Sequence, residues 1–345
     1  MKGTYSLLSD RKEEHLRIAS TRDVRSGRGT GLDRYALWHC ALPEMRLEDV
    51  NTETSFLGAT LGAPLLISAM TGGTPRASQV NANLAQAAQS NGLPFSVGSQ
   101  RIGLEQPALM STYRVREFAP DVFLMANLGA VQLNYGVTID ACLRAVSEIG
   151  ADALALHLNP LQEAIQPQGN TDFAGLIGKI RELCARAPCP VIVKEVGWGI
   201  SPAVARTLQE AGVAAIDVAG SGGTSWSRVE AHRVASEEDA SVAAAFDDWG
   251  IPTATALIRA REACPQLPLI ASGGIESGTD IVKCLALGAN VAGMARPLLA
   301  AALESAEATS AVVGIVLRQV RIAMFCLGVT RVSELSPEHL YQREA

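Results

Sequence analysis

The chain carries little charge, and it lacks the features that suit nucleic acid, a membrane or export. Only 19% of its 345 residues are charged and the net charge is −6, so no broad positive field is available to DNA or RNA. No uncharged apolar run approaches the roughly 18 residues of a membrane-spanning helix. The opening stretch, MKGTYSLLSDRKEEHLRIA, lacks the apolar centre of a signal peptide. These absences predict a cytoplasmic protein that binds neither nucleic acid nor membrane.

Neither the cysteines nor the glycines form a familiar metal or dinucleotide motif. The seven cysteines are scattered, with no C-x-x-C pair and no cluster with His at zinc spacing. We therefore expect reduced, mostly buried thiols. No G-x-G-x-x-G string follows an early apolar run, which argues against a dinucleotide-binding fold.

Short apolar runs alternate with helical patterns along most of the chain. Eight strands are predicted, at residues 64–68, 95–97, 123–126, 153–156, 191–194, 214–218, 269–271 and 291–293. Amphipathic stretches at 79–90, 139–149, 202–210 and 279–287 predict helices between several of them. Gly212 and Gly288 stand where a helix should stop before a strand. This alternation predicts an α/β protein, a (β/α)8 TIM barrel over residues 61–345, with an open doubly wound sheet as the alternative.

Two segments exceed a minimal barrel. Residues 1–60 contain a predicted helix at 12–19, a Gly/Arg-rich passage at 25–31 and a predicted hairpin, and we expect this extension to pack on the barrel and close it. Residues 220–251 form a long predicted loop that carries Trp226, Phe246 and Trp249. Because aromatic residues suit disorder poorly, we interpret this loop as a lid or an oligomer contact.

The strand ends carry the chemistry-bearing residues. His157, Asn159, Gln162 and Glu163 follow the strand at 153–156 within seven residues. In a β/α barrel the loops that leave the carboxyl ends of the strands hold the active site. The strings Ser272-Gly273-Gly274-Ile275 and Gly293-Met294-Ala295-Arg296 follow the last two strands, where glycine backbone and helix amides suit a phosphate.

Other strand ends are of a kind that suits a flavin. Small residues and amides at 68–73, Ser99, Asn127 and 221–224 would meet at the barrel mouth. Lys194 would stabilise the anion of a reduced flavin near its N1–C2=O edge. The alternative role for Lys194 is a salt bridge with Glu195 or another carboxylate.

These residues resemble one family along nearly the whole chain. The matching strings are RKEEH at 11–15, AMTGG at 69–73, SVGSQR at 96–101, HLNPLQE at 157–163, VKEVG at 193–197, SGGT at 221–224, SGGI at 272–275, DDWGIPT at 247–253 and MF at 324–325. The chain resembles the type 2 isopentenyl diphosphate isomerases. The 157–163 string and the Arg11-Lys12 pair are the more specific matches; the others are shared in part with further FMN barrels.

The resemblance implies that isopentenyl and dimethylallyl diphosphate are interconverted with FMN, which NADPH or NADH keeps reduced, and with Mg²⁺. It implies diphosphate binding by Arg11, Lys12, His15, Ser99, Gln100 and Arg101, with His157 and Asn159 beside them, a Mg²⁺ ligand in Glu163, and Gln162 facing the isoprenyl carbons. It implies FMN contacts at Ala69, Met70, Thr71, Ser99, Asn127, Lys194, Thr224, Gly273, Gly274, Ile275, Ala295 and Arg296. Barrels of this kind often assemble symmetrically, and we expect a homo-oligomer, a tetramer or octamer.

Three alternatives stay open at the level of sequence. Moving a double bond needs one proton delivered to carbon and one removed, and the donor is either N5 of reduced flavin, with Gln162 orienting, or His157. An FMN-dependent oxidoreductase, like a 2-hydroxy acid oxidase or an inosine monophosphate dehydrogenase, shares the phosphate loops. It would need a His base and Arg carboxylate clamps after late strands, or a Cys nucleophile in a catalytic loop, and the region around Ser225 offers no Cys. A non-catalytic flavin binder leaves Arg11, Lys12 and Glu163 without a role.

Overall fold

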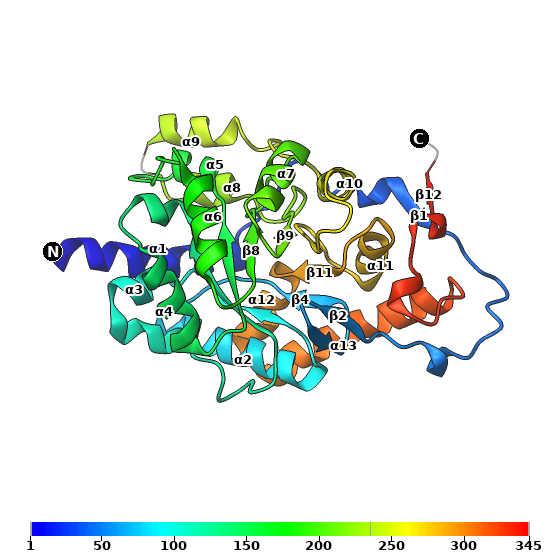
Figure 1. Cartoon of the computed structure of the whole chain (residues 1–345). Coiled ribbons are helices and arrows are strands. Elements are labelled where there is room, and N and C mark those ends of the chain that lie inside the picture. The colour runs from blue at the N-terminus through cyan, green and yellow to red at the C-terminus, as the bar shows by residue number, and fades with distance from the viewer. Residues whose placement is uncertain (1, 235, 344–345) are drawn as a thin grey trace.

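A closed parallel barrel forms the centre of the molecule (Figure 1). The computed structural model describes residues 2–234 and 236–343, with side chains from residue 10 onward. Around the barrel the strands run β10, β11, β4, β5, β6, β7, β8, β9. They are β4 (Leu65–Ile67), β5 (Phe95–Ser96), β6 (Leu124–Gly129), β7 (Ala153–His157), β8 (Val191–Lys194), β9 (Ala215–Asp217), β10 (Leu269–Ser272) and β11 (Val291–Met294). Each predicted strand overlaps one of these, so the barrel is confirmed and the open sheet is wrong.

Helices surround the barrel, and the local sequence sets where they begin and end. The longer ones are α2 (Pro75–Asn91), α4 (Ile139–Ile149), α6 (Leu176–Arg186), α7 (Pro202–Glu210), α10 (Thr253–Ala263), α11 (Gly278–Ala286), α12 (Arg296–Glu304) and α13 (Ala306–Phe325). Thr74, Thr138 and Ser201 cap α2, α4 and α7 by accepting a hydrogen bond from a first-turn amide. Gly212 and Gly288 follow α7 and α11 with φ of 88° and 106°, as predicted.

Alternation along the strands divides the barrel interior into an apolar floor and a polar mouth. Leu66, Met125, Ile192, Ala215 and Ile270 belong to one buried cluster at the floor, closed from below by Phe56 and Leu61. Side chains two positions apart on a strand share a face. The residues two positions further along these five strands therefore point into the same interior, nearer the carboxyl ends: Ser68, Asn127, Lys194, Asp217 and Ser272. The sequence thus changes from apolar to polar where the barrel opens.

The extension and the long loop both adopt regular structure. The hairpin β2 (Thr54–Phe56) and β3 (Ala59–Leu61) lies under the floor, and β1 (Tyr35–Leu37) pairs antiparallel with β12 (Leu340–Gln342). The predicted helix at 12–19 is longer, α1 (Lys2–Thr21), and its N-terminal end projects beyond the barrel (Figure 1). Residues 220–251 contain α8 (Trp226–Ala231) and α9 (Glu237–Ala244), so this segment is not an irregular loop.

Several short helices and 3-10 turns connect the longer elements. The short elements are α3 (Arg101–Glu105), α5 (Pro160–Ile165) and the 3-10 turns Leu32–Arg34, Leu47–Asp49, Pro107–Tyr113, Ala130–Asn134, Val332–Glu334 and Pro337–His339. By length and composition alone, α13 could cross a membrane. In this structure it packs against α2, α11 and α12.

Candidate active site

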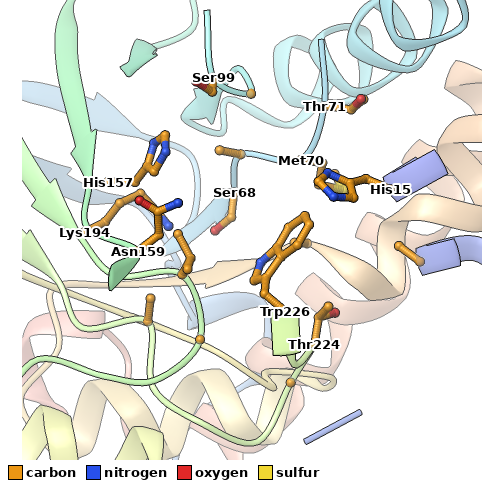
Figure 2. Close-up of a pocket in the computed structure, with 18 of the residues that line it drawn as sticks. His15, Ser68, Met70, Thr71, Ser99, His157, Asn159, Lys194, Thr224 and Trp226 are labelled. Atoms are coloured by element: carbon orange, nitrogen blue, oxygen red, sulfur yellow. The ribbon is translucent and has the colours of Figure 1, made fainter. Parts of the chain in front are cut away.

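A pocket of about 300 Å³ lies at the carboxyl ends of the barrel strands (Figure 2). Every predicted site residue except Gln100 lines it. The lining that the sequence did not predict includes Leu16, Ala19, Gly98, Gly129, Gln132, Gln166, Gly197, Trp226, Glu276 and Leu299. The extension, the strand ends and α8 therefore enclose one space.

One end of the pocket is cationic. Lys12 Nζ donates hydrogen bonds to Ser99 O and to Tyr113 Oη, both at 2.7 Å, which holds this side chain of α1 against the loop after β5. Burial, with the nearby guanidinium groups of Arg11 and Arg101, lowers the pKa of Lys12 to about 7. An anion bound here would favour the charged ammonium. Three cationic side chains thus face one site, and one of them titrates near neutral pH.

Glu163 is the carboxylate beside this cationic end. Its Oε1 accepts from Asn159 Nδ2 at 3.1 Å, and its Oε2 accepts from Asn170 N at 2.6 Å and from Gln166 Nε2. A carboxylate offers about four lone pairs, so about one is left for a cation. Among the described residues no group of three or more His, Cys, Asp or Glu side chains could hold a metal. Glu163 therefore suits a Mg²⁺ ion that takes its other ligands from phosphate and water.

A buried network joins Gln162 to the N-terminal helix. Gln162 Nε2 donates to Glu230 Oε1 at 3.1 Å, and His15 Nε2 lies 3.0 Å from the same oxygen. Burial opposes ionisation of Glu230, but its contacts with His15, Arg233 and Gln162 outweigh that cost and place its pKa at about 2. Burial lowers the pKa of His15, and its hydrogen bond with Glu230 opposes this shift. Because the ionised carboxylate can only accept, His15 Nε2 is the donor.

The Gln162 amide is also fixed at its oxygen. Asn159 Nδ2 donates to Gln162 Oε1 at 3.1 Å. With the nitrogen on Glu230 and the oxygen on Asn159, the amide has one orientation. The side chain of Gln162 therefore presents a fixed dipole to the pocket.

His157 stands at the end of β7, and it is uncharged. Its Nδ1 lies 2.8 Å from Asn127 Oδ1, an acceptor, so Nδ1 carries the proton. Burial, together with the charges of Lys194 and Lys12, lowers the pKa of His157 to about 3. The other ring nitrogen, Nε2, then carries no proton and can only accept a hydrogen bond. It could donate to an anion only if the ring gained a second proton.

Glycines make the opposite end of the pocket a close-fitting backbone cradle. A Cβ on Gly274 would lie 2.5 Å from Gly222 C, and one on Gly273 would lie 2.0 Å from Gly220 O. The loops after β9 and β10 therefore touch through backbone alone, and only glycine fits. Arg296 begins α12 beside them and lies 3.3 Å from Glu276. Backbone amides, a helix start and a guanidinium together suit the phosphate of FMN.

Three expectations differ from the structure. Gln100 is fully buried and its Nε2 donates to Ala145 O at 2.9 Å, so its side chain supports α4 and does not reach the pocket. The alternative of a Lys194 salt bridge with Glu195 is wrong: the Glu195 carboxylate accepts from the amides of residues 196–198, and Lys194 Nζ donates to Glu195 O. The cysteines are free thiols as expected, but four of the seven are only partly buried.

Sequence reasoning missed two functional candidates on α8. Trp226 lines the pocket with its ring centroid 5.1 Å from that of His15, and Glu230 holds Gln162 from behind (Figure 2 for Trp226 and His15). They are four residues apart and so lie on one face of the helix. Their spacing of four residues, directly after the Ser-Gly-Gly-Thr string at 221–224, is the sequence pattern that could have identified them as site residues.

The chain is similar to known proteins along nearly its whole length. Residues 134–342 match the family model of FMN-dependent dehydrogenases. A protein named isopentenyl-diphosphate delta-isomerase from Synechococcus sp. is 53% identical to this chain, over 93% of this chain and 92% of that protein. A protein of the same name from Stutzerimonas stutzeri is 49% identical, over 98% of both chains.

Solved structures agree in fold alone. A mandelate oxidase mutant with (S)-mandelic acid superposes with a TM-score of 0.66 at 18% identity, covering 99% of this chain and 98% of that one. An (S)-mandelate dehydrogenase mutant gives 0.65 at 16% identity, covering 96% and 99%. With its barrel, its pocket and relatives about half identical over nearly their whole length, the chain belongs to the flavin-dependent, type 2 isopentenyl-diphosphate delta-isomerase family of enzymes.

Proposed function

We propose that this enzyme interconverts isopentenyl diphosphate and dimethylallyl diphosphate for isoprenoid precursor synthesis, with FMN kept reduced by NADPH or NADH and with Mg²⁺. The observation that carries the proposal is a pocket that has a cationic end, an apolar wall at Trp226 and Met70, and the fixed amide of Gln162. The relatives named for this reaction support it, since they match the chain nearly end to end.

The diphosphate would bind at the cationic end. Arg11, Lys12 and Arg101 supply positive charge there, and Lys12 is held in place by Ser99 O and Tyr113 Oη. Glu163 would contribute one oxygen to a Mg²⁺ ion that also binds the phosphates. Because α1 delivers two of the cations, substrate binding and closure of the extension over the barrel would occur together.

The short hydrocarbon would lie between Trp226, Met70 and the flavin ring. Trp226 and Met70 occur on the same side of the pocket as His15 (Figure 2). Apolar walls exclude water, which protects an electron-deficient carbon from attack. Gln162, fixed by Asn159 and Glu230, would present its dipole to the reacting carbons without itself gaining or losing a proton.

The side chains around the reacting carbons are poor proton donors. Glu230 stays ionised because its pKa is about 2, and His157 stays neutral because its pKa is about 3. A general acid works best with a pKa near the working pH. When bound in its reduced form, FMN would supply the missing acid/base group at N5. This favours the flavin over His157 as the proton donor.

FMN itself would be held by the residues of the glycine cradle and the polar mouth layer. The FMN phosphate would contact Thr224, Gly273, Gly274, Ile275, Ala295 and Arg296, and the flavin ring would contact Ala69, Met70, Thr71, Ser99, Asn127 and Lys194. All of these residues line the pocket. We further propose that the enzyme works as a homo-oligomer in the cytoplasm.

Isotope exchange tests the proposal. The protein is incubated without oxygen in deuterium oxide with FMN, NADPH, Mg²⁺ and isopentenyl diphosphate. Deuterium should appear in dimethylallyl diphosphate at a rate that needs the reductant. Turnover with oxidised FMN at an equal rate, or no turnover, would contradict it. The oxidoreductase alternative predicts instead that a 2-hydroxy acid bleaches the bound flavin and that oxygen restores its colour.

A further inference from the structure

Asp217 is a buried carboxylate in the polar mouth layer to which the proposed reaction gives no role. It ends β9, is only 2% exposed, and pairs in register with Lys194 of β8. Its Oδ1 accepts from Ser272 Oγ at 2.7 Å and from Ala219 N at 3.1 Å. A carboxylate in the interior of a barrel is costly to bury without such partners. These two donors and the charge of Lys194 offset part of the cost of burying the carboxylate, but burial still raises its pKa.

A small cavity connects Asp217 with Lys194. It has a volume of about 10 Å³, close to that of one water, and Ser68, Lys194 and Asp217 line it. Within the described residues Ser68 Oγ is buried with no hydrogen-bond partner, and a Cβ on Gly293 would lie 2.5 Å from it. A side chain at position 293 would therefore displace the Ser68 hydroxyl. Three polar groups of different strands share a space in which one water can join them.

Glu195, the nearest other carboxylate along the chain, faces elsewhere. Its Oε2 accepts from the amides of Val196, Gly197 and Trp198. The Glu195 carboxylate therefore stabilises the backbone of the loop after β8. The charge of Lys194 acts on both carboxylates, and its Nζ donates to Glu195 O, but only Asp217 pairs with it in register between β8 and β9.

We propose that Asp217 is a positioning residue which partly offsets the positive charge of Lys194 below the flavin ring and so lowers the reduction potential of bound FMN. The inference rests on the proposed function, because it needs FMN at this mouth with Lys194 near its N1–C2=O edge. A cation there favours the reduced, negatively charged ring, and an anion beside that cation weakens the effect. The pair thus sets how readily FMN stays reduced between turnovers.

The midpoint potential of the bound flavin tests this in the FMN-loaded enzyme at pH 8. Burial raises the pKa of Asp217, so a higher pH favours its ionised form, and the comparison is repeated at increasing pH. Asp217→Asn should shift the reduced-to-oxidised ratio at least tenfold toward reduced FMN, about 30 mV for a two-electron couple. Asp217→Ser, a second charge-removing variant, should shift it in the same direction. Lys194→Met should shift it tenfold or more the opposite way.

Ser272→Ala is the matched control. It removes a donor to Asp217 but keeps the charge, so the ratio should change less than threefold. A potential unchanged in both Asp217 variants, or lowered as in Lys194→Met, would overturn the inference, because Asp217 would then only support the fold or hold Lys194. Failure of the unaltered protein to take up FMN would be a different result, since it would overturn the proposed function and this inference with it.

Discussion

Substrate binding should draw a proton into the enzyme through Lys12. Burial lowers the pKa of this side chain to about 7, so at pH 8 roughly one molecule in ten carries the ammonium in the unliganded enzyme. A diphosphate that binds beside it favours the charged form. We therefore expect uptake of up to about 0.9 proton per substrate bound at pH 8. Charging Lys12 at this pH costs about 1.4 kcal/mol, or tenfold in affinity.

The lowered pKa of Lys12 also determines how this residue affects the free energy of unfolding at different pH values. Because its pKa is lowered from 10.5 to about 7, the unfolded chain binds more protons than the folded chain between these values. Lys12 therefore lowers the free energy of unfolding of the unliganded protein by its largest amount below pH 7. This effect disappears as the pH rises toward 10.5. Lys12→Met should accordingly stabilise the unliganded protein more at pH 6 than at pH 9.

Calorimetry measures the proton uptake. Isopentenyl diphosphate is titrated into the enzyme with oxidised FMN and Mg²⁺, without reductant, in two pH 8 buffers of different ionisation enthalpy. Lys12→Arg should lose most of the uptake, because a guanidinium is already charged. Lys179→Arg is the control, since Lys179 lies on α6 outside the pocket and its Nζ donates to Leu133 O. No uptake by the unaltered enzyme, or equal uptake by Lys12→Arg, would refute the reasoning.

Further variants test other parts of the site. Glu163→Gln should remove the Mg²⁺ dependence of substrate binding and leave FMN bound. Loss of FMN instead would show that the role assigned to Glu163 is wrong. Trp226→Ala should lower kcat/KM about tenfold or more through the lost apolar wall, whereas Trp249→Ala, 59% exposed, should not; equal effects would contradict the assignment. Gly274→Ala should weaken FMN binding at least tenfold because its Cβ would strike backbone, and Gly178→Ala, with open space around it, is the control in an FMN titration.

The barrel and the place of its site were predictable because both depend on local patterns. Buried apolar runs such as 153–156 and 191–194 predicted strands, and the polar residues after them predicted which end carries the chemistry. Carboxyl ends of parallel strands in a closed barrel meet at one face. Residues as distant as Ser99 and Arg296 could therefore be assigned to one pocket without any contact information.

The sequence determined which side chains stand at the strand ends, and the tertiary structure decided what each one contacts. Gln100 is next to Ser99 in the chain yet turns to α4, because the backbone of a short helix start selects its direction. Glu230 supports Gln162 across 68 residues, and Lys12 reaches Tyr113 across 101. Such pairs form only after barrel closure brings α1, α5 and α8 together. Their burial then shifts pKa values that no local pattern contains.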